Sequence, residues 1–154
     1  MQHILVPILA AAYVQTLTGN FIRNQFKLMM DDVDKNKFER MDPMHHLLAG
    51  VKAKFTDDVC AAIDKCRRST GGAGFAAHSG LPDLYYNTSP TPTYEGDNIV
   101  MLLQASRYLL KLVKRTKDIK EQPYPFSYIS KIDWLLSIKG KGTTVDELLD
   151  LNTL

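Results

Sequence analysis

The sequence has little that would tie it to an oxidising compartment or to nucleic acid. Among its 154 residues are two cysteines, Cys60 and Cys66, six positions apart on one predicted helix. There they point to different faces, so we expect no disulfide and a reducing compartment by default. The formal net charge of +2 is too small to indicate binding to nucleic acid or to an anionic membrane surface.

Long apolar runs, targeting signals and metal-ligand clusters are also scarce. The apolar run from Ile4 to Val14 has no basic region before it and is shorter than the ~20 residues of a spanning helix, so we expect neither a secretory signal nor a membrane span. The final residues, Leu-Asn-Thr-Leu, are not a peroxisomal address. His45 and His46 are adjacent on a helix and diverge, which predicts no metal site.

What the sequence does have is helical periodicity. Apolar residues at helical spacing predict long helices at about 3–30, 43–69 and 97–115, and no segment favours a strand. Asp42 followed by Pro43 predicts the start of the second helix, and Gly71-Gly72 its end. Apolar residues cover more than one face of the third helix, which is therefore expected at the buried centre of an antiparallel bundle.

The remaining segments predict connectors and a C-terminal arm. Residues 31–40 form a charged connector, and residues 73–93 a long connection with one helical turn around 81–86, which favours a functional loop. Short helices follow at 130–138 and 145–151, with Trp134 as a packing anchor and a solvated turn at 140–142. The expected fold is all-α, with a helical domain at 1–117 and an extension at 118–154 packed on the bundle or on a partner.

Glu95 stands where a loop rich in Pro, Thr and Ser ends and an apolar helix begins. A carboxylate there lies near the positive end of the helix dipole and near backbone N–H groups that lack an intrahelical partner. Gly96 permits close approach of a ligand, and Asp97 or Asn98 is a natural N-cap. These residues suit a general base acting on a polarised carbonyl, and they equally suit a plain helix-terminal carboxylate.

A series of short motifs between Cys66 and Arg107 adds a family resemblance. In order they are Cys66-Arg67-Arg68, Gly71-Gly72-Ala73-Gly74-Phe75, Ser79-Gly80-Leu81-Pro82, Asn87, Thr93-Tyr94-Glu95-Gly96-Asp97-Asn98, Val100-Met101-Leu102-Leu103-Gln104 and Arg107. This series resembles the acyl-CoA oxidases, flavin-dependent relatives of the acyl-CoA dehydrogenases. The resemblance extends from about Leu5 to Lys114 and corresponds to the C-terminal helical region of that family.

The resemblance implies a flavin-dependent oxidation of fatty acyl-CoA to the trans-2-enoyl thioester, as in fatty acid β-oxidation, with oxygen reduced to hydrogen peroxide. Glu95 matches the carboxylate that removes the α-proton, and Gly96 a position against the acyl thioester. Donors on the thioester oxygen stabilise the developing enolate in this family, one of them the backbone N–H of the catalytic glutamate.

The cofactor implied is flavin adenine dinucleotide (FAD), shared with a partner chain or subunit. Arg68, Gly71 and Gly72 match the turn that touches its pyrophosphate–adenine end. Asp97 and Asn98 match positions that line the cofactor, with helix capping as an equal alternative. Where the family commonly has Gly-Gly-His-Gly-Tyr, residues 71–75 read Gly-Gly-Ala-Gly-Phe and lack two polar groups near this turn.

The family's β-barrel and preceding helical domain have no counterpart in this sequence, which leaves two readings. The chain is an enzyme component whose site is completed by a chain carrying those domains or by a homo-oligomer mate. Alternatively, it is a non-catalytic helical subunit with a structural role in a larger complex. The resemblance implies a peroxisome, with a mitochondrion as the alternative.

Overall fold

A computed structural model describes residues 1–115 and 125–138 of the chain. Its helices, in order, are α1 (Gln2–Val33), α2 (Met41–Ser69), the 3₁₀ segments η1 (Gly71–Gly74) and η2 (Ala77–Ser79), α3 (Leu81–Thr88), α4 (Asn98–Arg115), the 3₁₀ segment η4 (Phe126–Lys131) and α5 (Ile132–Ser137). These described ranges contain no strand. The predicted all-α fold is confirmed, and each long helix lies within three residues of its predicted bounds.

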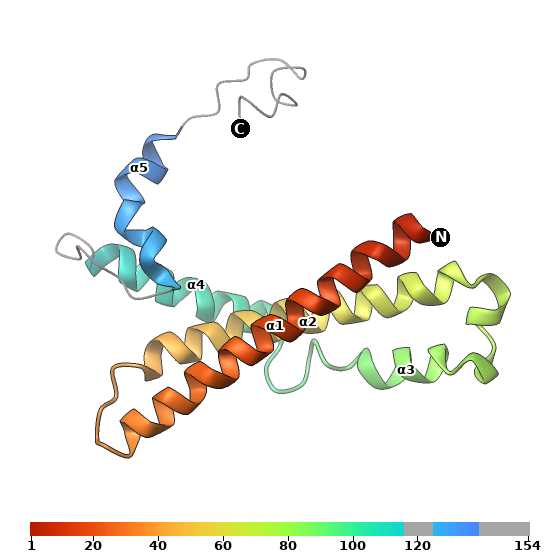
Figure 1. Cartoon of the computed structure of the whole chain (residues 1–154), viewed down its shortest axis with the longest axis horizontal. Helices are drawn as coiled ribbons and strands as arrows, with labels where there is room; N and C mark the ends of the chain where they lie inside the picture. The colour runs from red at the N-terminus through yellow and green to blue at the C-terminus, as the bar shows by residue number, and fades with distance from the viewer. Residues whose placement is uncertain (116–124, 139–154) are drawn as a thin grey trace. The chain divides into compact units, whose positions relative to one another are not determined.

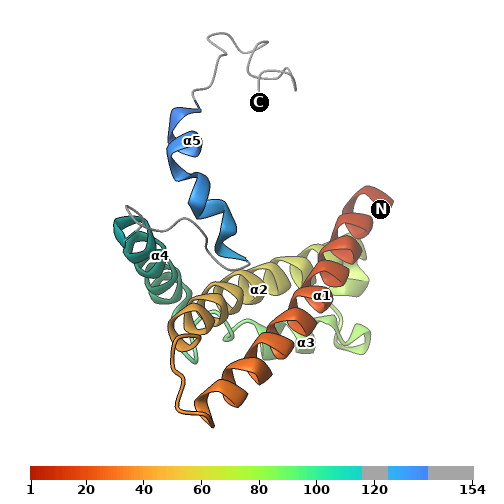
Figure 2. The same ribbon diagram turned by 60° about the vertical axis from the view of Figure 1, so that its left-hand side comes forward.

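The chain divides into two compact units, Met1–Tyr108 and Leu109–Leu154. In the first, α1 and α2 form an antiparallel pair whose axes cross, and α3 packs beside α2 (Figures 1 and 2). The N-terminal part of α4 runs back along α2, because Asn98 bonds to α2 at Ala53 while Ala105 lies opposite His46. Among the residues of the second unit that the structure describes, Leu112, Phe126 and Ile129 are buried.

Small side chains bring α2 and α4 close together. Ala49 and Ala53 share one face of α2 and are almost fully buried, as is Ala105 on α4. A Cβ placed on Gly50 would lie 3.8 Å from the Cβ of Ala105, an ordinary contact distance. The two backbones therefore approach closely enough for His46 Nδ1 to donate to the carbonyl oxygen of Ala105 at 2.9 Å.

His46 should make the stability of the α2–α4 contact depend on pH. Burial lowers its pKa, an effect opposed by the hydrogen bond to Ala105. The unfolded chain therefore binds the proton more readily than the folded one, and stability falls as pH drops below about 6.5, the ordinary histidine value. Thermal unfolding between pH 7 and pH 5 should show a smaller loss of Tm in His46→Asn than in the unmodified protein.

The neighbouring His45 provides the matched control, because it is exposed. His45→Asn should lose as much Tm over this pH range as the unmodified protein. Asp64, whose pKa is lowered chiefly by its hydrogen bond from Arg67, loses its contribution only below the ordinary aspartate range and does not interfere. An identical pH profile in both histidine variants would contradict the role of His46.

The expectation that α4 is the buried centre of a bundle is wrong for this chain. Ile99 and Leu103 are 71% and 65% exposed, and Val100 and Leu102 are also exposed. In the first unit, α4 packs on small residues of α2 on one side, and several of its other apolar side chains are largely exposed. The apolar pattern of a helix shows which faces can be buried. It does not show whether other helices of the same chain cover those faces.

Three further expectations need correction. The second helix begins at Met41 with Arg40 as its N-cap residue, so Asp42 lies in the first turn of the helix and not at its cap. The connector is shorter than expected because α1 continues to Val33. Trp134 is 61% exposed and is not a packing anchor; Phe126 and Ile129 are buried in that segment instead.

The apolar run after Ile4 is part of a longer element than expected, because α1 is one helix of 32 residues. By length and composition it qualifies as a spanning helix, with a mean hydropathy of 1.4 over its best window. Core helices of soluble proteins pass the same test, so this does not show a membrane span.

The predicted helix at 145–151, the turn at 140–142 and the domain boundary at 117 lie outside the described residues. The division of the chain into domains at 1–117 and 118–154 stays a prediction.

Candidate active site

The glycine turn that follows α2 is tightly built. Its first residue, Gly71, has a φ of +61°, in the left-handed region that favours glycine. A Cβ on Gly74 would lie 2.0 Å from the carbonyl oxygen of Arg67 and 2.4 Å from Thr70 Oγ1. Thr70 Oγ1 also donates to that carbonyl at 2.8 Å. Gly74 therefore lets the chain fold back against the last turn of α2, while Gly71 and Gly72 stay exposed.

Arg68 lies beside this turn as a surface cation. Its Nε is 3.0 Å from Asp64 Oδ2, and its side chain is 66% exposed. Arg67 holds the other oxygen of Asp64 at 2.7 Å. Because the pair with Asp64 is solvent-exposed, it holds Arg68 weakly, and its guanidinium is available to an anion at the glycine turn.

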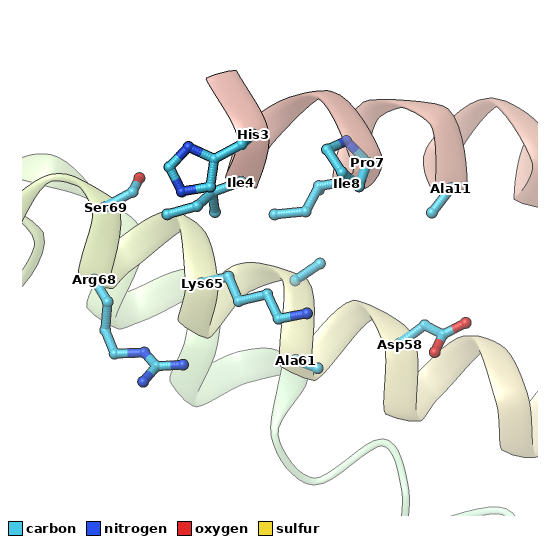
Figure 3. Close-up of a pocket in the computed structure, with 11 residues that line it drawn as sticks. His3, Ile4, Pro7, Ile8, Ala11, Asp58, Ala61, Lys65, Arg68 and Ser69 are labelled. Atoms are coloured by element: carbon cyan, nitrogen blue, oxygen red, sulfur yellow. The ribbon is translucent and has the colours of Figure 1, made fainter. Parts of the chain in front are cut away.

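An open cavity of about 620 Å³ lies between the start of α1 and the end of α2 (Figure 3). His3 and Ile4 project into it from α1, and Lys65 extends into it from α2, whereas Arg68 and Ser69 lie at its rim. The carboxylate of Asp58 and a set of apolar residues complete the lining (Pro7, Ile8, Ala11, Ala61 and Ala62). Its volume is in the range of small-molecule sites. Cations gather at one end of the cavity, Asp58 lies at the other, and apolar walls lie between them.

Glu95 lies in a second, separate turn before α4. Its backbone has a φ of +57°, and that of Gly96 a φ of +104°. The carboxylate is exposed, and among the described residues no hydrogen bond or ion pair engages it. A left-handed backbone at a residue with a side chain is strained, and such strain concentrates at functional sites.

The ends of this turn are held by local hydrogen bonds. Asp97 Oδ1 accepts from the N–H of Ile99 at 2.9 Å, which makes Asp97 the N-cap of α4 and confirms one of the two predicted caps. The N–H of Asn98 donates to the carbonyl of Pro92 at 2.9 Å. A Cβ on Gly96 would lie 2.5 Å from Met101 Cε, so the turn also packs on the first turn of α4.

Asn98 turns toward α2 and is only 6% exposed. Its Nδ2 donates to Asp57 Oδ1 at 2.7 Å, to Thr56 Oγ1 at 2.9 Å and to the carbonyl of Ala53 at 3.0 Å. Its Oδ1 accepts from Lys52 Nζ at 2.8 Å. This side chain fastens the Glu95 turn to the middle of α2.

The predicted site residues thus form two groups, which lie beside α2 at two different positions along its length. Glu95, Gly96, Asp97 and Asn98 lie together at the level of residues 53–57 of α2. Arg68 lies three to four helical turns further along α2, about 16 to 22 Å along the axis, and Gly71 and Gly72 follow the end of that helix. Within one chain, the base turn and the glycine turn therefore face different parts of a ligand or two different ligands.

Sequence reasoning missed Lys52, Thr56 and Asp57, which support the Glu95 turn, and His3 and Lys65, which line the cavity. The supporting residues precede the turn by about forty positions, and no local pattern links them to it. The alternation of charge and apolar residues on α2 marks them only as a solvated face.

Comparisons with known proteins agree with this architecture. The model of the acyl-CoA oxidase C-alpha1 domain matches residues 1–110. The chain is 30% identical over 153 residues to peroxisomal acyl-coenzyme A oxidase 1 of Mus musculus, covering 99% of this chain and 23% of that protein. It is 36% identical over 126 residues to acyl-coenzyme A oxidase 1 of Drosophila melanogaster, covering 82% of this chain and 19% of the relative.

A solved structure shares the fold. The chain superposes on Arabidopsis thaliana acyl-CoA oxidase 1 with a TM-score of 0.84 and 29% identity, over 99% of this chain and 23% of that one. The chain spans about a quarter of the length of these relatives. By its helices, its two turns and these matches, the chain belongs to the acyl-CoA oxidase family, whose C-terminal helical region it represents.

Proposed function

We propose that this chain supplies the α-proton-abstracting base and part of the flavin contact of an acyl-CoA oxidase that converts fatty acyl-CoA to trans-2-enoyl-CoA. The observation that carries the proposal is the strained turn at Glu95, fixed at both ends, with its carboxylate presented to solvent. A separate protein segment bearing the family's β-barrel completes the site. We place the assembly in the peroxisome, because the mammalian relatives carry that name.

The residues of this chain act on the α-carbon of the thioester. Glu95 accepts the α-proton, and the developing enolate oxygen needs a hydrogen-bond donor close by. Within the described part of the chain, the N–H of Glu95 has no intramolecular acceptor, so it is available to that oxygen. Gly96, lacking a Cβ, leaves room for the thioester beside the turn. A flavin held in the completed site would supply the acceptor for the hydride equivalent from the β-carbon and the route of its electrons to oxygen, which would leave as hydrogen peroxide.

The cavity at the end of α2 supports the cofactor part of the proposal. Lys65 and Arg68 bring two positive charges to its lining, which also contains Asp58. Gly71 and Gly72, which follow α2 and are not among the lining residues, expose backbone with no side chain above it. A pyrophosphate suits this combination of cations and close backbone approach. The glycine turn and Glu95 lie at different levels of α2. We therefore assign the flavin held at the glycine turn to the reaction centre of a neighbouring subunit, and not to the centre that contains Glu95 of the same chain. Asp97 and Asn98 act through the turn that carries Glu95: Asp97 caps α4, and the side chain of Asn98 bonds to α2.

An absorption spectrum of the natively purified protein tests this function. We expect the bands of oxidised flavin, which bleach when a saturated acyl-CoA is added without oxygen and return, with hydrogen peroxide, when air is admitted. A colourless preparation that does not oxidise acyl-CoA would overturn the proposal. That outcome would favour the structural alternative, for which the exposed apolar residues of α1 and α4 provide a surface for protein partners.

Replacing Arg68 with methionine tests the cofactor contact separately. Removal of a charged hydrogen-bond donor should weaken flavin binding about 10- to 100-fold, measured as flavin released on dilution or gel filtration. Arg23→Met is the control, since Arg23 is exposed on α1 and does not line the cavity. Equal flavin retention in the two variants would rule out the contact at Arg68.

A further inference from the structure

Lys52 is a cation in the middle of α2 that reaches the Glu95 turn. Its Nζ donates to the carbonyl oxygen of Gly96 at 2.6 Å and to Asn98 Oδ1 at 2.8 Å. Both bonds are partly buried, and they join residues more than forty positions apart. Hydrogen bonds from a charged donor are stronger than those between neutral groups, and they are strongest out of water.

The carbonyl that Lys52 binds is the one that fixes the strained part of the turn. Glu95 and Gly96 are consecutive left-handed residues, and an L-residue leaves that conformation unless tertiary contacts maintain it. The bonds of Asp97 and Asn98 hold the start of α4, on the far side of Gly96. The bond from Lys52 acts at Gly96 itself, the residue directly after Glu95.

Asn98 connects Lys52 to a counter-charge. Its oxygen accepts from Lys52, and its amide donates to Asp57 at 2.7 Å, so the amide dipole lies between the cation and the carboxylate. This arrangement fixes which way the amide of Asn98 points. Thr56 hydrogen-bonds to the same amide and closes the cluster. The turn is therefore stabilised by hydrogen bonds to charged groups as well as by packing.

We propose that Lys52 is the positioning residue for Glu95: its ammonium clamps the carbonyl of Gly96 and so sets where the Glu95 carboxylate and the neighbouring N–H groups meet the substrate. The inference rests on the proposed function, since it assigns Glu95 a proton to remove. Lys52 does not touch the substrate. It acts through the backbone of the turn, so its loss affects the reacting geometry more than substrate affinity.

Lys52→Met keeps the side-chain stem and removes the hydrogen-bond donor. The kinetics of this variant should be measured on the natively purified, flavin-containing protein. A displacement of reacting groups by about 1 Å costs about 100-fold, so we expect kcat to fall about 10- to 100-fold at little-changed KM. Lys52→Arg, which keeps a cation with several donors, should recover most of this loss. Hydrogen exchange at the amides of residues 95–98 should accelerate in Lys52→Met.

Lys54→Met is the matched control, because Lys54 lies on the same helix, is 70% exposed and pairs only with Asp58 among the described residues. It should retain kcat, KM and slow exchange at residues 95–98. If Lys52→Met does not fold, Lys52→Gln replaces it, with the same fall in kcat expected from its shorter reach.

The activity of Glu95→Gln should be measured in parallel, because this variant separates the positioning role of Lys52 from the function on which that role rests. Loss of activity in Glu95→Gln with normal kcat in the Lys52 variants would overturn the positioning role alone. A fall in kcat in Lys52→Met that Lys52→Arg does not reverse, or a matching rise in KM, would do the same. Full activity in Glu95→Gln would remove the proposed function and this inference together.

Discussion

Replacing Glu95 with glutamine should lower acyl-CoA oxidation by about 100- to 10,000-fold, the usual contribution of a positioned general base. Glutamine has nearly the same shape and keeps the backbone N–H that the enolate oxygen needs, but it cannot accept the α-proton. The direct measurement is exchange of the α-proton of a bound acyl-CoA with deuterated solvent. This exchange reports the proton step without oxygen, and it should be lost together with turnover.

The design includes two checks. Glu39→Gln changes an exposed carboxylate in the connector between α1 and α2, far along the chain from the turn, and should leave both exchange and turnover intact. The flavin content should be the same in Glu95→Gln and the unmodified protein, because the flavin contact proposed for this chain lies at the glycine turn, at a different level of α2 from the carboxylate. Normal α-proton exchange in Glu95→Gln would show that another group is the base.

The second large effect is expected on stability, at Gly74. Alanine there would bring its Cβ to 2.0 Å from a backbone oxygen, that of Arg67, which cannot move without unwinding the last turn of α2. Overpacking against backbone costs about 3 kcal/mol. For a chain of this size the loss corresponds to a fall in Tm of about 6 to 12 °C. Faster trypsin cleavage after Arg67 and Arg68 should accompany it.

Alanine substitutions at two neighbouring glycines provide the controls for Gly74→Ala. A Cβ on Gly72 would meet nothing within 4 Å and its φ is not positive, so Gly72→Ala should change stability by less than about 0.5 kcal/mol. Gly71→Ala also finds open space but must hold a φ of +61°, and it should cost about 1 kcal/mol. Equal losses at Gly72 and Gly74 would contradict the close packing of the turn.

The sequence by itself determined the elements. Helical spacing predicted three long helices close to their observed bounds, the glycine pair predicted the end of α2, and the cap at Asp97 was one of two candidates. The motif series predicted the family, which the comparisons confirm. These features are local, because spacing, capping and short motifs act over a few residues and can be read in order along the chain.

The tertiary structure decided what supports the candidate base and what stays exposed. Asn98 was predicted beside the cofactor or as a helix cap, and its side chain bonds to α2 instead. Lys52 was not among the predicted site residues, and it bonds to Gly96 across the fold. The apolar face of α4 was expected to be buried, and Ile99 and Leu103 are exposed. Each of these depends on pairing between distant segments, since a side chain's partners are set by which helix lies opposite, and periodicity within one helix does not specify that neighbour.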